Sequence, residues 1–210
     1  FDVPYKLIAA DVNASGSITA RDVSELRKLI LGVQNVFESN TSWNFVDSNY
    51  PLSFDNYASY KNKVVVLDFA NSLLNVDFIS IKTGDVTGEA NTGFGGNAQS
   101  RNNKMMLLEL DQLDAAKSDF IKIPVRNAGD LVVASGLQME FKIDQNDLEF
   151  AGIESGVLNI NSTDYNYLKE GSIRLSWNND TELNILNSDV LFYLLFNVKN
   201  NIVLGYNELK

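Results

Sequence analysis

Two folded parts of different class are predicted for this chain: a small α-rich domain with a short β insert over residues 1–90, and an antiparallel β-sandwich of the jelly-roll type over residues 104–210. Three observations predict this division. Near the N-terminus, oxygen-bearing side chains recur at every second position and lead into an amphipathic helical pattern. Residues 91–103 are rich in Gly and Asn, which indicates a flexible linker. Beyond the linker, apolar and polar residues alternate with period two, as in half-buried strands.

The oxygen-bearing side chains belong to residues 11–22, whose spacing is that of a calcium loop of the EF-hand type. The candidate ligands are the side chains of Asp11, Asn13, Ser15 and Asp22 at loop positions 1, 3, 5 and 12, and the backbone carbonyl of Ser17 at position 7. Gly16 falls where such a loop turns sharply, and Thr19 would act through a water. Ile18 is the apolar residue expected to anchor the loop to a core. The loop therefore predicts a Ca2+ site.

Two departures from the usual loop predict a weak site. Ser15 replaces a carboxylate or carboxamide, and Asp22 replaces the longer Glu that chelates with both oxygens. Because only Asp11 and Asp22 bring full charge, the affinity is expected to suit the calcium concentrations found outside cells and not those of a cytosolic sensor. The alternative is an Asx-rich turn that caps a helix, although such a turn does not require ligands at alternate positions.

Residues 22–31 predict the helix that follows the loop. Apolar residues recur there at three- and four-residue steps, which is the period of an amphipathic helix. These apolar positions are Val23, Leu26, Leu29 and Ile30. Gly32 is placed to end the helix.

The pattern Asp-x-Asn-x-Ser-Gly-x-Ile-Thr-x-x-Asp, followed by Val-x-x-Leu-x-x-Leu-Ile-Leu-Gly, resembles the dockerin module of cellulosomes over residues 5–33. The resemblance implies a second loop-helix half. Residues 77–88 are its counterpart, with a short helix expected before the opening of a loop at Asp85. The candidate ligands of this second metal site are Asp85, Thr87 and Glu89. Position 12 of that loop falls on Gly96, which has no side-chain oxygen, so outside ligands would have to complete the site.

Residues 34–76 form an insert between the two halves, in which residues 43–46 and 63–67 predict short strands. The aromatic residues of the insert are Trp43, Phe45, Tyr50, Phe54, Tyr57 and Tyr60. These rings either build the core of a small domain, the interpretation we favour because aromatics bury the most area, or form a platform for sugars. With the Ile-Lys-x-Gly-Asp-Val ending at residues 81–86, the insert is similar to dockerin-like modules of large secreted Bacteroidetes surface proteins.

The alternation beyond the linker predicts a series of strands with one solvated face. The predicted strands span residues 105–110, 120–125, 137–143, 148–153, 173–177 and 190–198. Residues 191–198 are apolar on both faces, which suits a central strand buried on both sides. The alternative is a strand whose outer face meets a partner.

Residues 104–210 resemble a cohesin module, the β-sandwich that receives dockerins, in the pattern and order of the strands. The segments that carry the resemblance are residues 121–127, 135–141, 148–153, 173–177 and 191–196. A cohesin would continue for one or two strands past Lys210, so either this module is truncated at its C-terminus or its fold closes differently.

Composition narrows the function classes. The chain has no Cys and no His, 27 acidic against 17 basic residues, and a formal net charge of -10. This acidity argues against nucleic acid and anionic membranes as partners, and no apolar run is long enough for membrane insertion. Because no disulfide can staple the fold, calcium is expected to do so in a protein that is secreted or held at the cell surface.

The missing His and Cys also remove the usual bases, nucleophiles and zinc ligands, and we predict that the protein is not an enzyme. Two carboxylate pairs have the composition of glycosidase acids, Asp144 with Asp147 and Asp111 with Asp114. They lie in turn-like segments and are interpreted as solvated loop residues.

The predicted function is a non-catalytic, calcium-stabilised region for protein–protein interaction or self-association, such as part of an adhesin or filament. The dockerin resemblance implies partner contacts at Ala20, Arg21, Arg27 and Lys28, and the alternative for the two last residues is a solvated helix face. The alternative function is a carbohydrate-binding appendage of a secreted glycoside hydrolase, with Trp43 or Trp177 stacked on sugar. A structural stalk without a partner is a third interpretation.

Overall fold

The structure, a computed structural model, describes residues 2–62, 77–88, 90, 106–111 and 113–204. The chain divides into two compact units, Phe1–Ala98 and Gln99–Lys210. Each unit has a hydrophobic core of its own. The predicted linker, residues 91–103, and the predicted strand at residues 63–67 lie outside the described residues.

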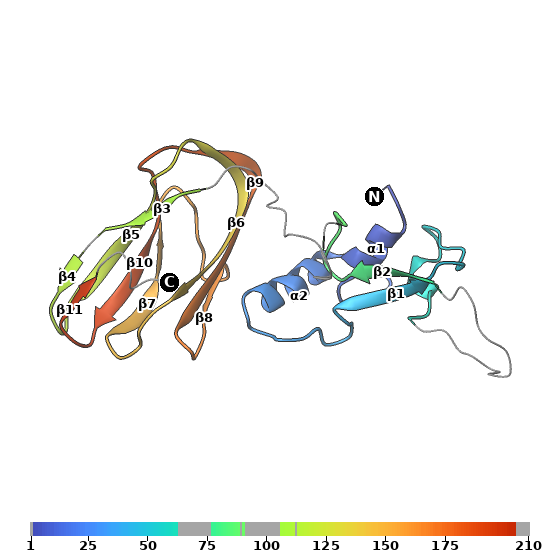
Figure 1. The fold of residues 1–210 in the computed structure, drawn as a ribbon, viewed down its shortest axis with the longest axis horizontal. Coiled ribbons are helices and arrows are strands. Elements are labelled where there is room, and N and C mark those ends of the chain that lie inside the picture. The colour runs from blue at the N-terminus through green and yellow to red at the C-terminus, as the bar shows by residue number, and fades with distance from the viewer. Residues whose placement is uncertain (1, 63–76, 89, 91–105, 112, 205–210) are drawn as a thin grey trace. The chain divides into compact units, whose positions relative to one another are not determined.

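The first unit combines helices with a small sheet (Figure 1). Its elements are α1 (Tyr5–Ala10), α2 (Ala20–Ile30), β1 (Trp43–Asp47), a short 3-10 helix η1 (Tyr57–Ser59) and β2 (Phe78–Lys82). Among the described residues it therefore has two α-helices and a two-stranded antiparallel sheet, so the α-rich character expected from the sequence is not found. None of the described helices is long and apolar enough to span a membrane.

The helix predicted within residues 77–88 is wrong, because residues 78–82 form strand β2. Ile79 and Ile81 alternate with exposed Ser80 and pair with β1, with Val46 opposite Ile79. Alternation with period two places both isoleucines on the inner face of the ribbon, which a helix could not do.

A small core holds the first unit together. Its buried residues are Ile8, Ala9, Val46 and Ile81, and the half-buried residues around them include Tyr5, Tyr50, Tyr57 and Tyr60. Three of the six aromatic residues of the insert thus pack on this core, as the core interpretation predicts. Phe45 and Phe54 are 45% and 49% exposed and are not core residues.

Helix α2 buries less of its apolar pattern than its sequence predicts. Leu26, Leu29 and Ile30 are partly buried, but Val23 is 67% exposed. Ile18 is 40% exposed, so the expected anchor of the loop is wrong, and Val12, which is 3% exposed, packs inward instead. The apolar periodicity predicts the helix correctly, but it does not predict how much of the apolar face neighbouring elements bury.

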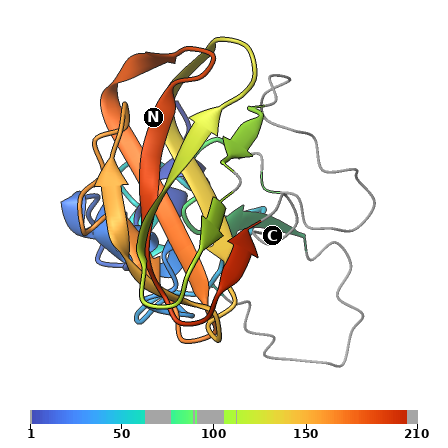
Figure 2. The ribbon, with the colours of Figure 1, turned by 90° about the vertical axis from the view of Figure 1, so that its left-hand side faces the viewer.

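The second unit is an antiparallel β-sandwich, as predicted (Figures 1 and 2). The described strands are β3 (Leu108–Leu110), β4 (Leu113–Ala115), β5 (Phe120–Asn127), β6 (Val132–Lys142), β7 (Leu148–Ser155), β8 (Tyr165–Tyr167), β9 (Ser172–Ile185), β10 (Val190–Val198) and β11 (Ile202–Leu204). One sheet has the order β3-β5-β10-β7 and the other β6-β9-β8, while β11 pairs with β4. Edge-to-face contacts join the two sheets, with ring centroids 6.0 Å apart for Phe141 and Phe192 and 5.8 Å apart for Phe150 and Tyr165.

Strand β10 is a central strand, as predicted for residues 191–198, but only one of its faces is fully buried, because Tyr193 and Leu195 are half-buried and Asn197 is exposed. It lies between β5 and β7, and Leu191, Phe192, Leu194 and Phe196 have no exposed surface. Trp177 on β9 is 4% exposed and belongs to the same core, so it cannot stack on a sugar.

Candidate metal site and the helix it supports

The predicted calcium loop connects α1 to α2 and encloses two buried carboxylates. Asp11 follows directly on α1 and is 7% exposed, and Asp22 lies in the first turn of α2 and is 2% exposed. Gly16 has a φ of 78°, a backbone conformation that side chains with a Cβ rarely adopt. The sharp turn expected at position 6 is therefore present.

Backbone N–H groups of the loop point inward to these carboxylates. The amides of Ser15 and Gly16 donate to Asp11, at 2.8 Å to Oδ1 and 2.7 Å to Oδ2. The amides of Asn13 and Thr19 donate to Asp22, at 3.1 Å to Oδ1 and 2.8 Å to Oδ2. Both acids are thus held by the loop that they organise.

The oxygen atoms of the predicted ligands gather on one side of the loop. Ser15 Oγ lies 3.4 Å from Asp11 Oδ1 and 3.0 Å from the Ser17 carbonyl oxygen, and Asn13 Oδ1 accepts from the Ser15 amide at 3.0 Å. Ligands that bind Ca2+ at about 2.3–2.6 Å lie roughly 3 Å from one another around the ion. The all-oxygen donor set, with its partly formed spacing, fits a hard cation such as Ca2+.

Only two members of this donor set carry full charge. Within the described ranges, no group of three or more His, Cys, Asp or Glu side chains is arranged to hold a metal ion. The remaining donors of the loop are an amide, a hydroxyl and a backbone carbonyl, which make weaker ligands than carboxylates. This balance agrees with the weak affinity that the sequence predicts.

The loop also caps helix α2. Thr19 is the N-cap residue, its Oγ1 accepts from the Arg21 amide at 3.2 Å, and Asp22 completes a capping box with the Thr19 amide. These hydrogen bonds are the ones expected under the alternative interpretation, in which residues 11–22 are an Asx-rich turn that caps a helix. The same two residues therefore serve helix initiation whether or not an ion is bound.

Burial and hydrogen bonding act in opposite directions on Asp22. Burial raises its pKa, but the amides of Thr19 and Asn13 stabilise the carboxylate more strongly and hold the pKa below its ordinary value. Across the loop, burial and the negative charges of Asp11 and Asp22 raise the pKa of Tyr57. The loop is thus a negatively charged environment that a cation would stabilise.

Two residues of the insert support this loop, and sequence reasoning missed both roles. Asn40 Nδ2 donates to the carbonyls of Asp11 and Val12, at 3.1 Å each. Tyr57 Oη donates to the Gly16 carbonyl at 2.8 Å. The partners in these hydrogen bonds are 28 to 41 residues apart in the sequence, so no local pattern predicts the bonds. The insert contains many other polar and phenolic side chains, and nothing in the sequence distinguishes Asn40 and Tyr57 from them.

The second candidate site is partly described. Asp85 follows β2, and its Oδ1 accepts from Thr87 Oγ1 at 2.9 Å and from the Gly88 amide at 3.0 Å, so two of its predicted ligands lie together. Its Oδ2 accepts from the Ala90 amide at 2.7 Å. Glu89 lies outside the described residues. The bond from Asp85 Oδ2 to an amide five residues on repeats the bond between Asp11 Oδ2 and the Gly16 amide in the first loop.

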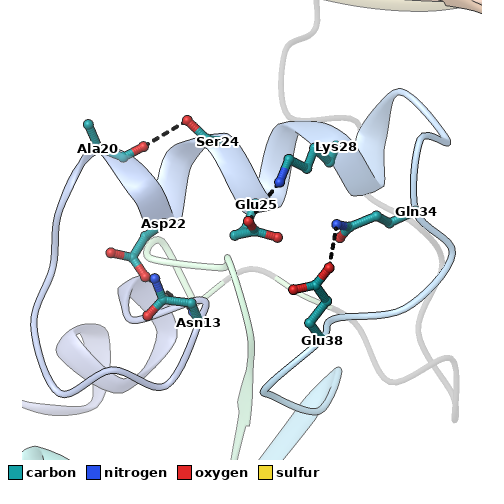
Figure 3. A network of polar contacts seen from close by, with 8 residues as sticks. All are labelled: Asn13, Ala20, Asp22, Ser24, Glu25, Lys28, Gln34 and Glu38. Atoms are coloured by element: carbon teal, nitrogen blue, oxygen red, sulfur yellow. Dashed lines mark hydrogen bonds and ion pairs between the residues drawn. The ribbon is translucent and has the colours of Figure 1, made fainter.

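The predicted partner contacts occupy different environments on α2. Ala20 and Arg21 are exposed at its N-terminal turn, while Arg27 is half-buried. Lys28 Nζ pairs with Glu25 Oε1 at 2.8 Å (Figure 3). Beside them Gln34 bonds to Glu38, and Ser24 Oγ donates to the Ala20 carbonyl at 3.0 Å. The N-terminal end of the helix is therefore the more accessible part of the predicted contact surface.

The carboxylate pairs of the second unit lie in turns and on the surface. Asp144 Oδ1 accepts from the Asn146 amide at 2.8 Å, and Asp147 Oδ1 from Asn200 Nδ2 at 3.3 Å. Asp111 is 3.5 Å from an Arg126 guanidinium nitrogen, and Asp114 is exposed on β4. Turn capping and surface pairing account for these residues.

No family model and no curated protein matches this chain. The solved structures that resemble it are cohesin modules. The seventh ScaB type I cohesin of Pseudobacteroides cellulosolvens matches 44% of this chain and 64% of its own, at 19% identity and a TM-score of 0.37. The sixth cohesin of Acetivibrio cellulolyticus scaffoldin B, solved with a Cel5 dockerin mutant, matches 49% and 77%, at 19% identity and a TM-score of 0.38. A type I cohesin–dockerin complex of Clostridium thermocellum, Coh-OlpA-Doc918, matches 49% and 78%, at 16% identity and a TM-score of 0.37. This chain thus spans less than two thirds of the first of these neighbours.

Proposed function

We propose that this protein is a non-catalytic interaction module that acts outside the cell, in which a calcium ion stabilises the loop and helix of the first unit so that the helix can bind a protein partner. One observation carries the proposal. Val23 is 67% exposed near the start of α2, whose N-cap and capping box belong to the predicted calcium loop. A single exposed valine is ordinary on a protein surface, so Val23 supports the proposal only together with the exposed Ala20, Arg21 and Ser24 beside it on the same helix.

The chain's own residues prepare the loop for an ion. Asp11 and Asp22 are buried within one loop, where two negative charges repel each other and lose hydration. Bound Ca2+ would neutralise that charge and replace the missing hydration. Since Asp22 also completes the capping box of α2, an ion held by this carboxylate would stabilise the start of the helix.

The surface offered by α2 mixes apolar and basic groups. Ala20, Val23 and Ser24 share one exposed face at three- and four-residue spacing, and Arg21 is exposed beside them. A partner that fits this surface has a shallow apolar site with acidic groups at its rim. Because the chain itself carries a net charge of -10, a second copy of it can supply such groups.

The sandwich enters the proposal through the resemblance of residues 104–210 to cohesins. The two named complexes contain cohesins bound to dockerins. By this analogy the sandwich is the receiving module and the loop-helix unit the docking module, so copies of the chain could join head to tail. Two different surfaces that pair in this way produce chains or filaments unless a ring closes.

The test is the molar mass and elution volume of the full chain, by size exclusion with light scattering, in calcium and in chelator. The proposal predicts association, or a change of hydrodynamic size, that requires calcium. Val23→Asp is expected to abolish association. Val36→Asp, at an equally exposed valine (72%) outside α2, is the matched control and should leave it unchanged. A monomer with the same elution volume and melting temperature in both buffers contradicts the proposal.

A second candidate function, carbohydrate binding, is favoured by the outer face of the β1–β2 ribbon. Phe45 and Phe78 are 45% and 42% exposed on that face, and Lys82 Nζ lies 5.3 Å from the centroid of the Trp43 ring. Flat rings beside hydrogen-bonding groups can stack on sugars. Sugar binding on a glycan array that is lost in Trp43→Ala or Phe45→Ala, and kept in Val23→Asp, would favour this function over protein docking.

A further inference from the structure

The peptide units on the two sides of Gly16 are held from opposite directions. On the inner side, the Gly16 amide donates to Asp11 Oδ2 at 2.7 Å. On the outer side, the Gly16 carbonyl accepts from Tyr57 Oη at 2.8 Å. The next carbonyl along the chain, that of Ser17, is the predicted backbone ligand. The hydroxyl of Tyr57 therefore fixes the orientation of the peptide that leads directly into a ligand.

The beginning of the loop is held in a similar way. Asn40 Nδ2 donates to the carbonyls of Asp11 and Val12, at 3.1 Å each. Asn40 is itself fixed, because its Oδ1 accepts from the Thr41 amide at 2.8 Å and from Asn44 Nδ2 at 3.2 Å. Asn44 is 3% exposed and donates to Thr83 Oγ1 at 3.0 Å, which connects the support to the end of β2.

We infer that Tyr57 and Asn40 are positioning residues for calcium, which hold the loop in its binding conformation by hydrogen bonds to backbone carbonyls that are not among its predicted ligands. The inference rests on the proposed calcium site and adds a consequence to it. The insert, which supplies both residues, is part of the metal site although it contributes no ligand.

The physical reason is preorganisation. A free twelve-residue loop loses conformational entropy when it closes on an ion, and bonds that fix its carbonyls beforehand reduce that loss. The coupling has to act in both directions, because a bond that improves calcium binding is itself strengthened when calcium binds. Calcium should therefore order the segment around residues 40–59 as well as the loop.

Geometry around η1 supports this coupling. A Cβ built on Gly16 would lie 3.3 Å from Ala58 Cβ, so η1 packs directly on the turn of the loop. Burial raises the pKa of the Tyr57 hydroxyl, and the negative charges of Asp11 and Asp22 raise it further. The segment and the carboxylates are therefore close enough to affect each other energetically.

The test is calorimetric titration of Ca2+ into chelator-stripped full-length protein, for the native chain, Tyr57→Phe and Tyr50→Phe. Phenylalanine keeps the ring and removes only the hydroxyl. Tyr50 packs on the same small core and serves as the matched control. The loss of one hydrogen bond of ordinary strength predicts a Kd about fivefold weaker for Tyr57→Phe, and an unchanged Kd for Tyr50→Phe. Asn40→Ala is expected to weaken binding in the same direction.

A purely structural role for Tyr57 gives a different result. It would lower the melting temperature of calcium-free Tyr57→Phe and leave its calcium Kd unchanged, which overturns the inference while the calcium site stands. A native chain that binds no calcium overturns the inference and the proposed function together. Hydrogen exchange provides a second readout: calcium should slow amide exchange over residues 40–59 in the native chain and slow it less in Tyr57→Phe. Equal protection in both chains overturns the inference.

Discussion

Gly16→Ala, compared with Gly88→Ala, tests whether η1 is seated on the calcium loop. Both glycines have a positive φ, 78° and 76°, so each alanine variant accepts the same backbone strain. At Gly88 a new Cβ meets no atom within 4 Å, whereas at Gly16 it lies 3.3 Å from Ala58 Cβ. The pair thus separates the cost of the backbone conformation from the cost of displacing η1.

The magnitudes follow from these contacts. The left-handed conformation costs a residue with a Cβ roughly 1 kcal/mol, and this applies to both variants. Relieving the contact at Gly16 requires Ala58 to move away, which stretches the hydrogen bond from Tyr57 to the Gly16 carbonyl. Losing that bond adds about 1 kcal/mol. We expect the first unit to lose about 2 kcal/mol in Gly16→Ala and about 1 kcal/mol in Gly88→Ala.

The assay is urea unfolding followed by tryptophan fluorescence. The chain has two tryptophans, and in a Trp177→Phe background Trp43 alone reports on the first unit. Equal destabilisation by the two alanines would refute the reasoning, because the contact between η1 and the loop would then contribute nothing.

Two further predictions concern the carboxylate of Asp22 and the core of the sandwich. Hydrogen bonds lower the pKa of Asp22 in the folded protein below its ordinary value of 3.8. The stabilisation from this carboxylate is therefore complete above pH 3.8 and is lost as the pH falls through the lowered folded-state pKa. Thermal melts in chelator should show this loss of stability in acid for the native chain and a flatter pH profile for Asp22→Asn. Identical pH profiles for these two chains would rule out this role of Asp22. Phe192→Ala removes a ring with no exposed surface from the sandwich core and should lower the free energy of unfolding by about 3–5 kcal/mol. Phe120→Ala, at a ring that is 61% exposed, should change it by about 0.5 kcal/mol or less. Denaturant titrations measure both values. Similar losses in both variants would contradict the assignment of the core.

The sandwich could be predicted from the sequence because strands such as β6 and β9 are long and carry an alternating pattern, whereas the three-residue strands β4, β8 and β11 are too short to show one. Residues 137–143 show one polar face, and residues 191–198 show none, which matches an outer strand and a central strand of the observed sheets. The spacing of polar residues in residues 11–22 also predicted the sharp turn at Gly16, where φ is 78°, while calcium binding by this loop stays a prediction.

The features that the sequence did not predict depend on contacts between residues far apart in the chain. The analogy with a second loop-helix half predicts a short helix within residues 77–88, but residues 78–82 pair with Trp43–Asp47, more than thirty positions away. Val23 follows the helical period of a core residue but is 67% exposed, because none of the described elements of this unit covers it. Asn40 and Tyr57 gave no signal for a similar reason, since their partners in the loop are distant in sequence.

The central claim is that residues 11–22 bind calcium, and titration calorimetry of Ca2+ into the chelator-stripped chain tests it most directly. The account predicts saturable binding to the loop with a Kd of about 10⁻⁴–10⁻³ M, the range of extracellular calcium modules, a higher melting temperature in calcium, and the loss of both in Asp11→Ala. Absence of binding heat, together with the same melting temperature in calcium and in chelator, would contradict the claim and leave the loop as a helix cap without a metal.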